Sequence, residues 1–238
     1  SQGDLGTCVG WATNWAARTM VAAMHGQWQD PLHIEANAFS PGFIYHVIKD
    51  KKDQDCTFGA SIFDALNYMK FNGTIKNADY KEQCGGYIDE QMLVEAEAYR
   101  IKDFARLFDK EKSDRFKVQA IKKSLAERNP VIIGIKCPPS FYLAREVWEP
   151  TEDPETIGNG HAVCVVGYDD SKFGGAFEIM NSWGTRWANG GFAWIRYSDF
   201  GRFTKYAYEM IHEPPQSLVA VNPAALPSVV TELPSPRP

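Results

Sequence analysis

Cys8 lies where a glycine-punctuated loop, QGDLGTC, runs into an alanine-rich segment that we expect to be helical. A cysteine attacks a carbonyl carbon as the thiolate, and a free thiol is mostly protonated at neutral pH. The N-terminus of a helix carries about half a positive charge, which favours an anion placed there. The position of Cys8 therefore predicts a nucleophile rather than a structural thiol.

A histidine beside the cysteine would complete this chemistry by forming a thiolate–imidazolium pair. The sequence has five histidines. His25 lies at the far end of the expected helix, and nothing in the surrounding sequence distinguishes His33, His46 or His212. His161 differs, because it follows a glycine turn and opens the apolar segment HAVCVVGYD. A strand there would hold the imidazole rigidly, so we expect His161 to be the base.

The segment NSWGTRW supplies a third polar group. Asn181 ends a predicted strand, and its amide oxygen can accept a hydrogen bond from one imidazole nitrogen, as the third member of a catalytic triad does. The indole of Trp183, two residues later, can cover that bond and exclude water. Asn, Ser and Gly also favour turns, so the segment NSWG is compatible with a simple turn as well.

The composition limits the classes of protein to which the chain can belong. Its 238 residues are 44% hydrophobic, which is ordinary for a globular protein with a sizeable core. The net charge of -5, with no basic run, argues against nucleic acid as the main partner. No apolar run approaches the ~18 residues of a membrane-spanning helix. Five cysteines without a CxxC pair disfavour a zinc ribbon, and no metal site is expected.

Helical patterns fill the first half of the chain and strand patterns fill most of the second. A first helix is expected over residues 8–25, with Thr7 as its cap and Gly26 at its end. Ser40 followed by Pro41 is a typical start for another helix. Further helices are expected in SIFDALNYMKFNG, DEQMLVEAEAY and SDRFKVQAIKKSLAERNP. Strands are expected in RIKDFARLF, VIIGIKC, HAVCVVGYD, GAFEIMNSW, GGFAWIRY and KYAYEMIH.

This order of helices before strands predicts an α+β protein of two lobes. Residues 1–99 would form a mainly helical lobe that carries the nucleophile. Residues 100–213 would form a β-rich lobe that carries His161 and Asn181. Residues 214–238 are rich in proline and nearly uncharged, so we expect an extended tail or linker there.

Three segments, QGDLGTC, GHAVCVVGYD and NSWGTRW, resemble in this order the active-site blocks of papain-like cysteine peptidases. The resemblance extends, more weakly, over residues 2–212. It implies a helical N-terminal lobe, an antiparallel β C-terminal lobe and an active-site cleft between them. It also implies that Cys8 is the nucleophile and that His161 is the base that later becomes an acid. Asn181 would orient the imidazole, and Trp183 would shield it.

The resemblance also assigns residues around the nucleophile. Gln2 matches the side-chain donor of the family's oxyanion hole, which lies beside the backbone N–H of Cys8. The family's substrate lies extended near the loop that contains Gly59 and Ala60, and Gly59 resembles a glycine whose backbone pairs with substrate. Gly160, immediately before the histidine, leaves that wall of the cleft open.

The chain departs from the family pattern close to the nucleophile. Leu5 stands where a disulfide cysteine is common, and Val9 stands where a tryptophan is common. A leucine at this position is more like the bacterial members of the family. Cys56 and Cys84 roughly match other family cysteines, which implies a possible disulfide between them. The two remaining cysteines are expected to be buried free thiols: Cys137 and Cys164.

The resemblance implies a thiol-dependent peptidase, expected to be an endopeptidase, that acts as a monomer on polypeptides without a metal or cofactor. A proregion or a protein inhibitor is a further expected partner in the cleft. Peptidases of this type are usually exported or kept in acidic compartments. We therefore expect a secreted or exported protein, of bacterial type, whose signal region is not present in this chain.

Two other functions remain open on the same residues. An acyltransferase or amidase would hand the acyl group to an acceptor other than water. A non-catalytic papain-fold binding module is disfavoured, because the catalytic set is complete: Cys8, His161, Asn181 and Gln2. The acidic stretch EVWEPTEDPE could favour basic substrates through its field, although a solvated loop explains it better.

Overall fold

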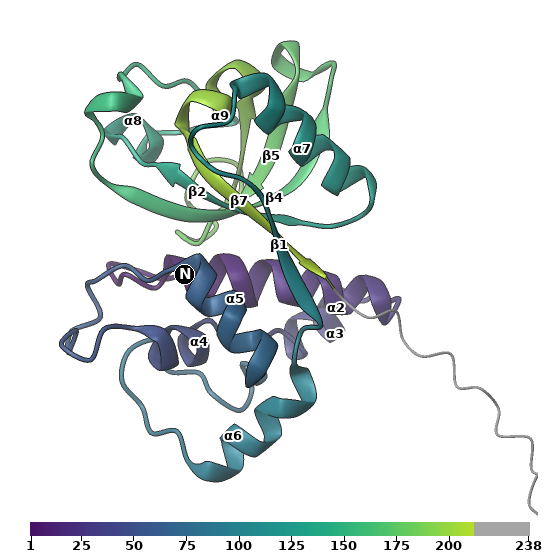
Figure 1. The fold of residues 1–238 in the computed structure, drawn as a ribbon, viewed down its shortest axis with the longest axis vertical. Helices are drawn as coiled ribbons and strands as arrows, with labels where there is room; N and C mark the ends of the chain where they lie inside the picture. The colour runs from purple at the N-terminus through teal and green to yellow at the C-terminus, as the bar shows by residue number, and fades with distance from the viewer. Residues whose placement is uncertain (212–238) are drawn as a thin grey trace, which may run out of the picture.

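The structure, a computed structural model, describes residues 1–211. Its main helices are α1 (Cys8–Gly10), a π-helix (Trp11–Arg18), α2 (Thr19–His25), α3 (Pro31–Ala36), α4 (Pro41–Ile48), α5 (Ile62–Phe71), α6 (Glu90–Ala96), α7 (Asp114–Ala126), α8 (Pro139–Tyr142) and α9 (Tyr197–Phe203). Its strands are β1 (Asp103–Phe108), β2 (Val131–Lys136), β3 (Val147–Trp148), β4 (Gly160–Asp169), β5 (Ala176–Met180), β6 (Phe192–Arg196) and β7 (Thr204–Ile211). The helices from α1 to α6 lie on one side, and the sheet with α7, α8 and α9 lies on the other (Figure 1). The predicted α+β fold is confirmed.

The segment from Cys8 to His25 is one continuous helix, as predicted, although its middle is wound as a π-helix. It lies against the sheet, with α1 and the π-helix packed on β4 (Figure 1). The prediction that Thr7 caps this helix is wrong, because its side chain makes no capping hydrogen bond. Thr7 has φ -86° and ψ 10°, whereas a capping residue is usually extended, so its hydroxyl does not reach the free N–H groups.

Serine caps begin three of the other helices. Ser40, Ser61 and Ser113 precede α4, α5 and α7, and each hydroxyl accepts a hydrogen bond from the backbone N–H three residues later. Such a cap stabilises a helix by about 1 kcal/mol, because that N–H has no partner within the helix. Gly73 follows the end of α5 with φ +85°, the left-handed conformation that favours glycine. The predicted start at Pro41 is also confirmed.

The strands lie in the order β1-β7-β2-β4-β5-β6-β3. Neighbouring strands are antiparallel except β3 and β6, which form a short parallel pair. The central strand β4 lies between β2 and β5 and places His161 opposite Ile135. All six predicted strands are present. The sequence patterns do not predict β3, α3, α8 or α9, because each is too short for its periodicity to be recognised.

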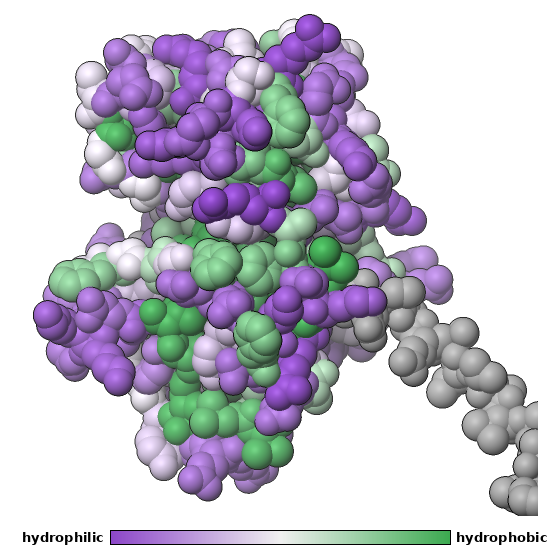
Figure 2. Space-filling model, in the orientation of Figure 1, coloured by the Kyte–Doolittle hydropathy of each residue, from purple (hydrophilic) through white to green (hydrophobic). Residues whose placement is uncertain are grey.

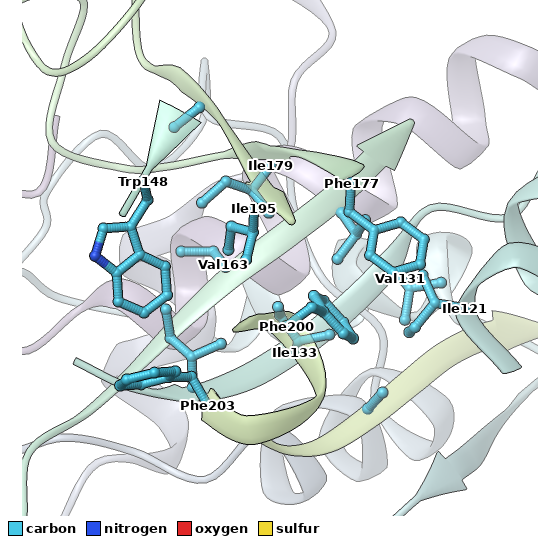
Figure 3. Close-up of a cluster of buried hydrophobic side chains, with 14 of the residues drawn as sticks. Ile121, Val131, Ile133, Trp148, Val163, Phe177, Ile179, Ile195, Phe200 and Phe203 are labelled. Carbon is cyan, nitrogen blue, oxygen red and sulfur yellow. The ribbon is translucent and has the colours of Figure 1, made fainter. Parts of the chain in front are cut away.

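The core lies on both faces of the sheet, because successive side chains of a strand point to opposite faces. On β2, Ile133 packs with α7 and α9, whereas Ile132 packs with the first helix. Figure 3 shows the first of these clusters, with Ile121 of α7 and Phe200 of α9 beside the strands. The cluster between this face and the first helix also contains several small side chains: Ala12, Ala16, Ala162 and Cys164.

One disulfide joins the segments on either side of α5. It links Cys56 to Cys84, as the resemblance implied. Cys137 and Cys164 are buried free thiols, as predicted, and Cys8 is a partly buried free thiol. The loop before α5 is therefore held covalently to the loop after it.

The division into lobes at residues 99 and 100 stays a prediction, and the tail predicted for 214–238 lies outside the described residues. On the face shown in Figure 2, apolar surface gathers over α5 and α6, whereas the sheet side is mostly polar. The exposed large apolar side chains on these two helices are Phe63, Phe71, Leu93 and Val94. No helix within residues 1–211 is long and apolar enough to cross a membrane.

Replacing Phe200 tests the core that α9 forms with the sheet. Phe200 is fully buried, so Phe200→Ala is expected to lower the free energy of unfolding by about 3–5 kcal/mol through lost contacts and the cavity left behind. Phe116→Ala on α7 is the matched control, because Phe116 is 47% exposed and its loss should cost under about 1 kcal/mol. Urea denaturation measures both, and equal losses would contradict the packing described.

Candidate active site

Three structural elements position the predicted site residues. Cys8 begins α1, His161 is the second residue of β4, and Asn181 directly follows β5. Because β4 and β5 are antiparallel neighbours, the start of β4 lies beside the end of β5. The backbone N–H of Ala162 faces the Cys8 sulfur, so the head of the helix meets the same end of β4. Each of the three side chains is thus carried by a rigid element.

A hydrogen bond joins His161 to Asn181. The distance from His161 Nε2 to Asn181 Oδ1 is 2.7 Å. The same Oδ1 accepts a hydrogen bond from the backbone N–H of Ser182 at 2.8 Å, which identifies it as the amide oxygen. Nε2 must therefore carry the hydrogen, and in the neutral ring Nδ1 is left as an acceptor. This is the tautomer that a general base for a thiol requires.

Aromatic rings surround the imidazole. The indole of Trp183 stacks on the His161 ring at 4.8 Å between centroids, with 28° between planes. Phe141 of α8 lies 5.9 Å from the same ring, and Tyr142 stacks on Trp183 at 4.6 Å. His161 and Asn181 are 8% and 9% exposed, so their hydrogen bond is largely removed from water. Shielding of this kind strengthens an electrostatic contact because the local dielectric is low.

Gln2 is fixed by hydrogen bonds to Leu5 in its own loop and to Ser182 in the loop after β5. Its backbone N–H donates to the Ser182 carbonyl at 2.8 Å, and its Oε1 accepts from the Ser182 hydroxyl at 2.5 Å. Its Nε2 donates to the Leu5 carbonyl at 2.6 Å. An amide nitrogen has two hydrogens, so one N–H of Gln2 has no protein acceptor within residues 1–211. The rigid hold on the amide makes this N–H a fixed donor.

The loop before α5 touches the loop that precedes Cys8. The backbone N–H of Gly6 donates to the Cys56 carbonyl at 2.7 Å. A Cβ on Gly6 would lie 2.2 Å from the Phe58 carbonyl oxygen, so only glycine allows this approach. That oxygen lies 2.7 Å from the hydroxyl of Tyr45, which also meets the buried Asp53 carboxylate at 2.5 Å. A buried polar network thus sets the position of this loop.

The predicted substrate-binding residues differ in exposure. Gly59 and Gly160 are exposed, and Ala60 is half-buried. No atom lies within 4 Å of where a Cβ on Gly59 would be, so its backbone is open to an approaching chain. The nearest atom to such a Cβ on Gly160 is 3.8 Å away. Both glycines leave room for a ligand backbone.

Burial disfavours a charge on either reacting group. It raises the pKa of the Cys8 thiol, while backbone N–H groups oppose that rise. It lowers the pKa of His161 to about 4, against the opposing effect of the bond to Asn181. Burial thus disfavours a lone charge on either group, and no hydrogen bond joins them within residues 1–211. A proton passed from thiol to imidazole would create two opposite charges that stabilise each other.

Residues 4–210 match the sequence model of a family described as papain family cysteine protease. The chain belongs to the papain family. Cathepsin K of Gallus gallus is 30% identical over 194 residues, which cover 80% of this chain and 52% of that protein. Peptidase 1 of Dermatophagoides pteronyssinus is 25% identical over 171 residues, which cover 68% of this chain and 49% of that protein. The chain spans about half the length of these relatives.

Solved structures of papain-family proteases share the fold. Xylellain, a cysteine protease from Xylella fastidiosa, superposes with a TM-score of 0.67 at 21% identity over 90% of this chain and 82% of that chain. The bromelain protease from Ananas comosus, solved with an inhibitor, gives 0.68 at 17% identity over 90% of this chain and 92% of that chain. The papain-like fold implied by the three sequence blocks is confirmed.

The sequence predictions missed two residues of this papain-family site. Ser182 connects the others, because its hydroxyl donates to Gln2 and its backbone N–H donates to Asn181. A serine after Asn181 is visible in NSWG, but nothing in a turn sequence reveals a partner 180 residues away. Phe141 lies on the unpredicted helix α8, and only the folded chain brings it beside His161.

The titration of His161 tests how deeply the site is buried. In a Cys8→Ala variant, NMR is expected to give His161 a pKa of about 4, below its ordinary value of 6.5. Because the folded-state pKa lies below the unfolded one, the group's stabilising contribution is complete above pH 6.5. It falls by up to about 3 kcal/mol as the pH drops toward 4. Adding His161→Gln should remove this pH dependence, and a folded-state pKa near 6.5 would contradict the burial described.

Proposed function

We propose that this chain is a cysteine-type peptidase that hydrolyses peptide bonds through an acyl-enzyme on Cys8. One observation carries the proposal: the 2.7 Å hydrogen bond between His161 and Asn181, beside a helix that begins with a free cysteine. Because Nε2 donates its hydrogen to Asn181, Nδ1 of the buried imidazole is the nitrogen that can accept the thiol proton. Membership of the papain family supports the same reaction.

The first half of the reaction forms the bond to sulfur. The Cys8 thiol passes its proton to Nδ1 of His161, and the thiolate attacks the carbonyl carbon of the scissile bond. Two donors can meet the resulting oxyanion: the backbone N–H of Cys8, which has no acceptor within its helix, and the second N–H of Gln2 Nε2. The loss of one such donor typically slows an enzyme by about 10²–10³.

The second half breaks the peptide and frees the enzyme. The carbon–nitrogen bond breaks as the imidazolium gives its proton to the leaving amine, and the acyl group stays on sulfur as a thioester. Water then gives a proton to Nδ1 and attacks the thioester, and the imidazolium returns that proton to the departing sulfur. Asn181 holds the ring in one orientation throughout, because Nε2 stays bonded while Nδ1 takes and gives the proton.

We assign the acyl part of the substrate to the open backbone at Gly59. An extended peptide can pair with such a backbone through main-chain hydrogen bonds. Ala60 would line the same wall, and the exposed Gly160 would keep the approach to His161 free. A cleft that accepts an extended chain suits cleavage within a polypeptide, which favours an endopeptidase.

Cleavage of a peptide library tests the proposed reaction. Wild-type protein is expected to release two hydrolysis products, which mass spectrometry identifies. Cys8→Ala should abolish turnover and leave the melting temperature nearly unchanged, because Cys8 is only partly buried. Cys137→Ala is the matched control and should retain activity. Products in which the acyl group has moved to an added amine instead of water would indicate the acyltransferase or amidase alternative.

Alkylation tests whether His161 activates Cys8. Iodoacetamide at a pH of about 5–6 is expected to label Cys8 far faster than Cys137 or Cys164, because only an activated thiol is a thiolate at that pH. Exposure alone could give the same order, since the other two thiols are buried. His161→Gln separates the causes and should slow labelling of Cys8 by at least about tenfold. Equal rates in wild type and variant would indicate a non-catalytic binding module.

We further propose that the chain is an exported protein of the bacterial type. Leu5 in place of a disulfide cysteine supports the subtype. The Cys56–Cys84 disulfide supports folding in an oxidising compartment, where such bonds persist. A proregion or protein inhibitor that lies across Cys8 would be the natural protein partner of a cleft of this kind, and the protein would otherwise act as a monomer.

A further inference from the structure

A cavity of about 700 Å³ lies beside the candidate active site. Its wall includes Trp183, whose indole stacks on the His161 imidazole. Tyr142 and Leu143, at and just beyond the end of α8, form an apolar side and are 59% and 79% exposed. The remaining polar and charged side chains on the wall are Ser1, Asp4, Arg145 and Arg186.

The proposed reaction directs the leaving group toward this cavity. In the proposed reaction, His161 must give its proton to the leaving amine, so that nitrogen lies at the imidazole. The acyl part is assigned above to the backbone at Gly59, which does not line the cavity. The peptide beyond the leaving nitrogen therefore continues past the imidazole, over Trp183, and reaches the cavity.

The two arginines of this cavity have no anionic partner in the part of the chain that the structure describes. Within residues 1–211, neither Arg145 nor Arg186 makes an ion pair or a side-chain hydrogen bond, and both are exposed at the cavity wall. Asp4 is the one acidic side chain on the same wall, so the wall side chains carry a net positive charge. Guanidinium groups bind carboxylates strongly, because two parallel N–H donors match two carboxylate oxygens.

The nearby acidic stretch does not cancel this charge. Glu149 is paired with Arg196 at 2.6 Å, and Glu155 is paired with Lys136 at 3.0 Å. Glu152 accepts hydrogen bonds from the backbone N–H and the hydroxyl of Ser140. These contacts engage three of the five acidic groups of the stretch, and none of the five lines the cavity. The contacts favour the solvated loop over the basic-substrate preference considered from the sequence.

We propose that this cavity binds a carboxylate carried by the leaving part of the substrate, held by Arg145 and Arg186. The carboxylate belongs either to an acidic side chain or to the free C-terminus of a short leaving segment. The proposal rests on the proposed peptidase function, because it assigns the cavity to the leaving group. The catalytic residues alone give no preference for the charge of the leaving part of the substrate, and this cavity would add one.

Matched quenched fluorescent peptides test the preference. All share one acyl part, and the leaving part carries Glu, Gln or Lys at one position and ends in an amide. A second set carries Gln and ends either in an amide or in a free acid at successive lengths. For wild type, kcat/KM is expected to be about 5-fold higher for Glu than for Gln, since a partly exposed ion pair contributes about 1 kcal/mol. The ratio should shrink as salt rises from about 50 to about 500 mM.

Variants assign the preference to the two arginines. The double variant Arg145→Gln/Arg186→Gln is expected to bring the Glu-to-Gln ratio to about 1. Arg115→Gln is the matched control, because it removes the same charge from an exposed position on α7, away from the cavity, and should keep the wild-type ratio. A gain confined to the free-acid peptides at one length would identify the terminal carboxylate as the ligand, and a gain with Glu would identify an acidic side chain.

The outcomes separate the two proposals. Equal cleavage of the Glu, Gln and Lys peptides and of both C-terminal forms would overturn the carboxylate site and leave the peptidase proposal intact. A ratio that persists in the double variant would also overturn it. No cleavage of any peptide, including the neutral ones, would overturn the peptidase function and, with it, the assignment of the cavity.

Discussion

The site depends on close contact between the first helix and strand β4. Small side chains line this contact, with Ala16 from the helix against Ala162 from the strand. Cys8 heads the helix, and His161 is the strand residue just before Ala162. The relative position of sulfur and imidazole is therefore set by this packing, and a larger side chain in the contact would force a backbone shift or a strained rotamer.

Hydrogen bonds from the first residues of the chain complete this arrangement. Gln2 crosses from the helical side to the sheet side and bonds to Ser182, whose backbone N–H also orients the amide of Asn181. The candidate oxyanion donor and the residue that orients the imidazole thus share one serine. A shift of Ser182 would therefore displace both Gln2 and Asn181.

The sequence predicted the residues of the candidate site better than it predicted the contacts between them. Regular elements were predictable because their signals are local: a serine before Pro41 gives a cap, and the apolar run in HAVCVVGYD gives a strand. Thr7 shows the limit of this reasoning, since the residue type suits a cap but the backbone at that position does not. The aromatic wall at Phe141 and the bridge at Ser182 depend on pairs far apart in sequence, and no local pattern encodes them.

The disulfide places a chemical condition on the whole molecule. Cys56 is bonded to Cys84, and its carbonyl receives the N–H of Gly6, two residues before Cys8. The proposed reaction requires two sulfur states close together. Cys56 and Cys84 must stay oxidised as a disulfide, whereas Cys8 must stay reduced so that it can act as a thiolate. An oxidant strong enough to cap Cys8 would block the proposed nucleophile, and a reductant strong enough to open the disulfide would release the loop that contacts the segment before it. The redox potential of the surroundings thus bounds the conditions under which this fold can do its chemistry.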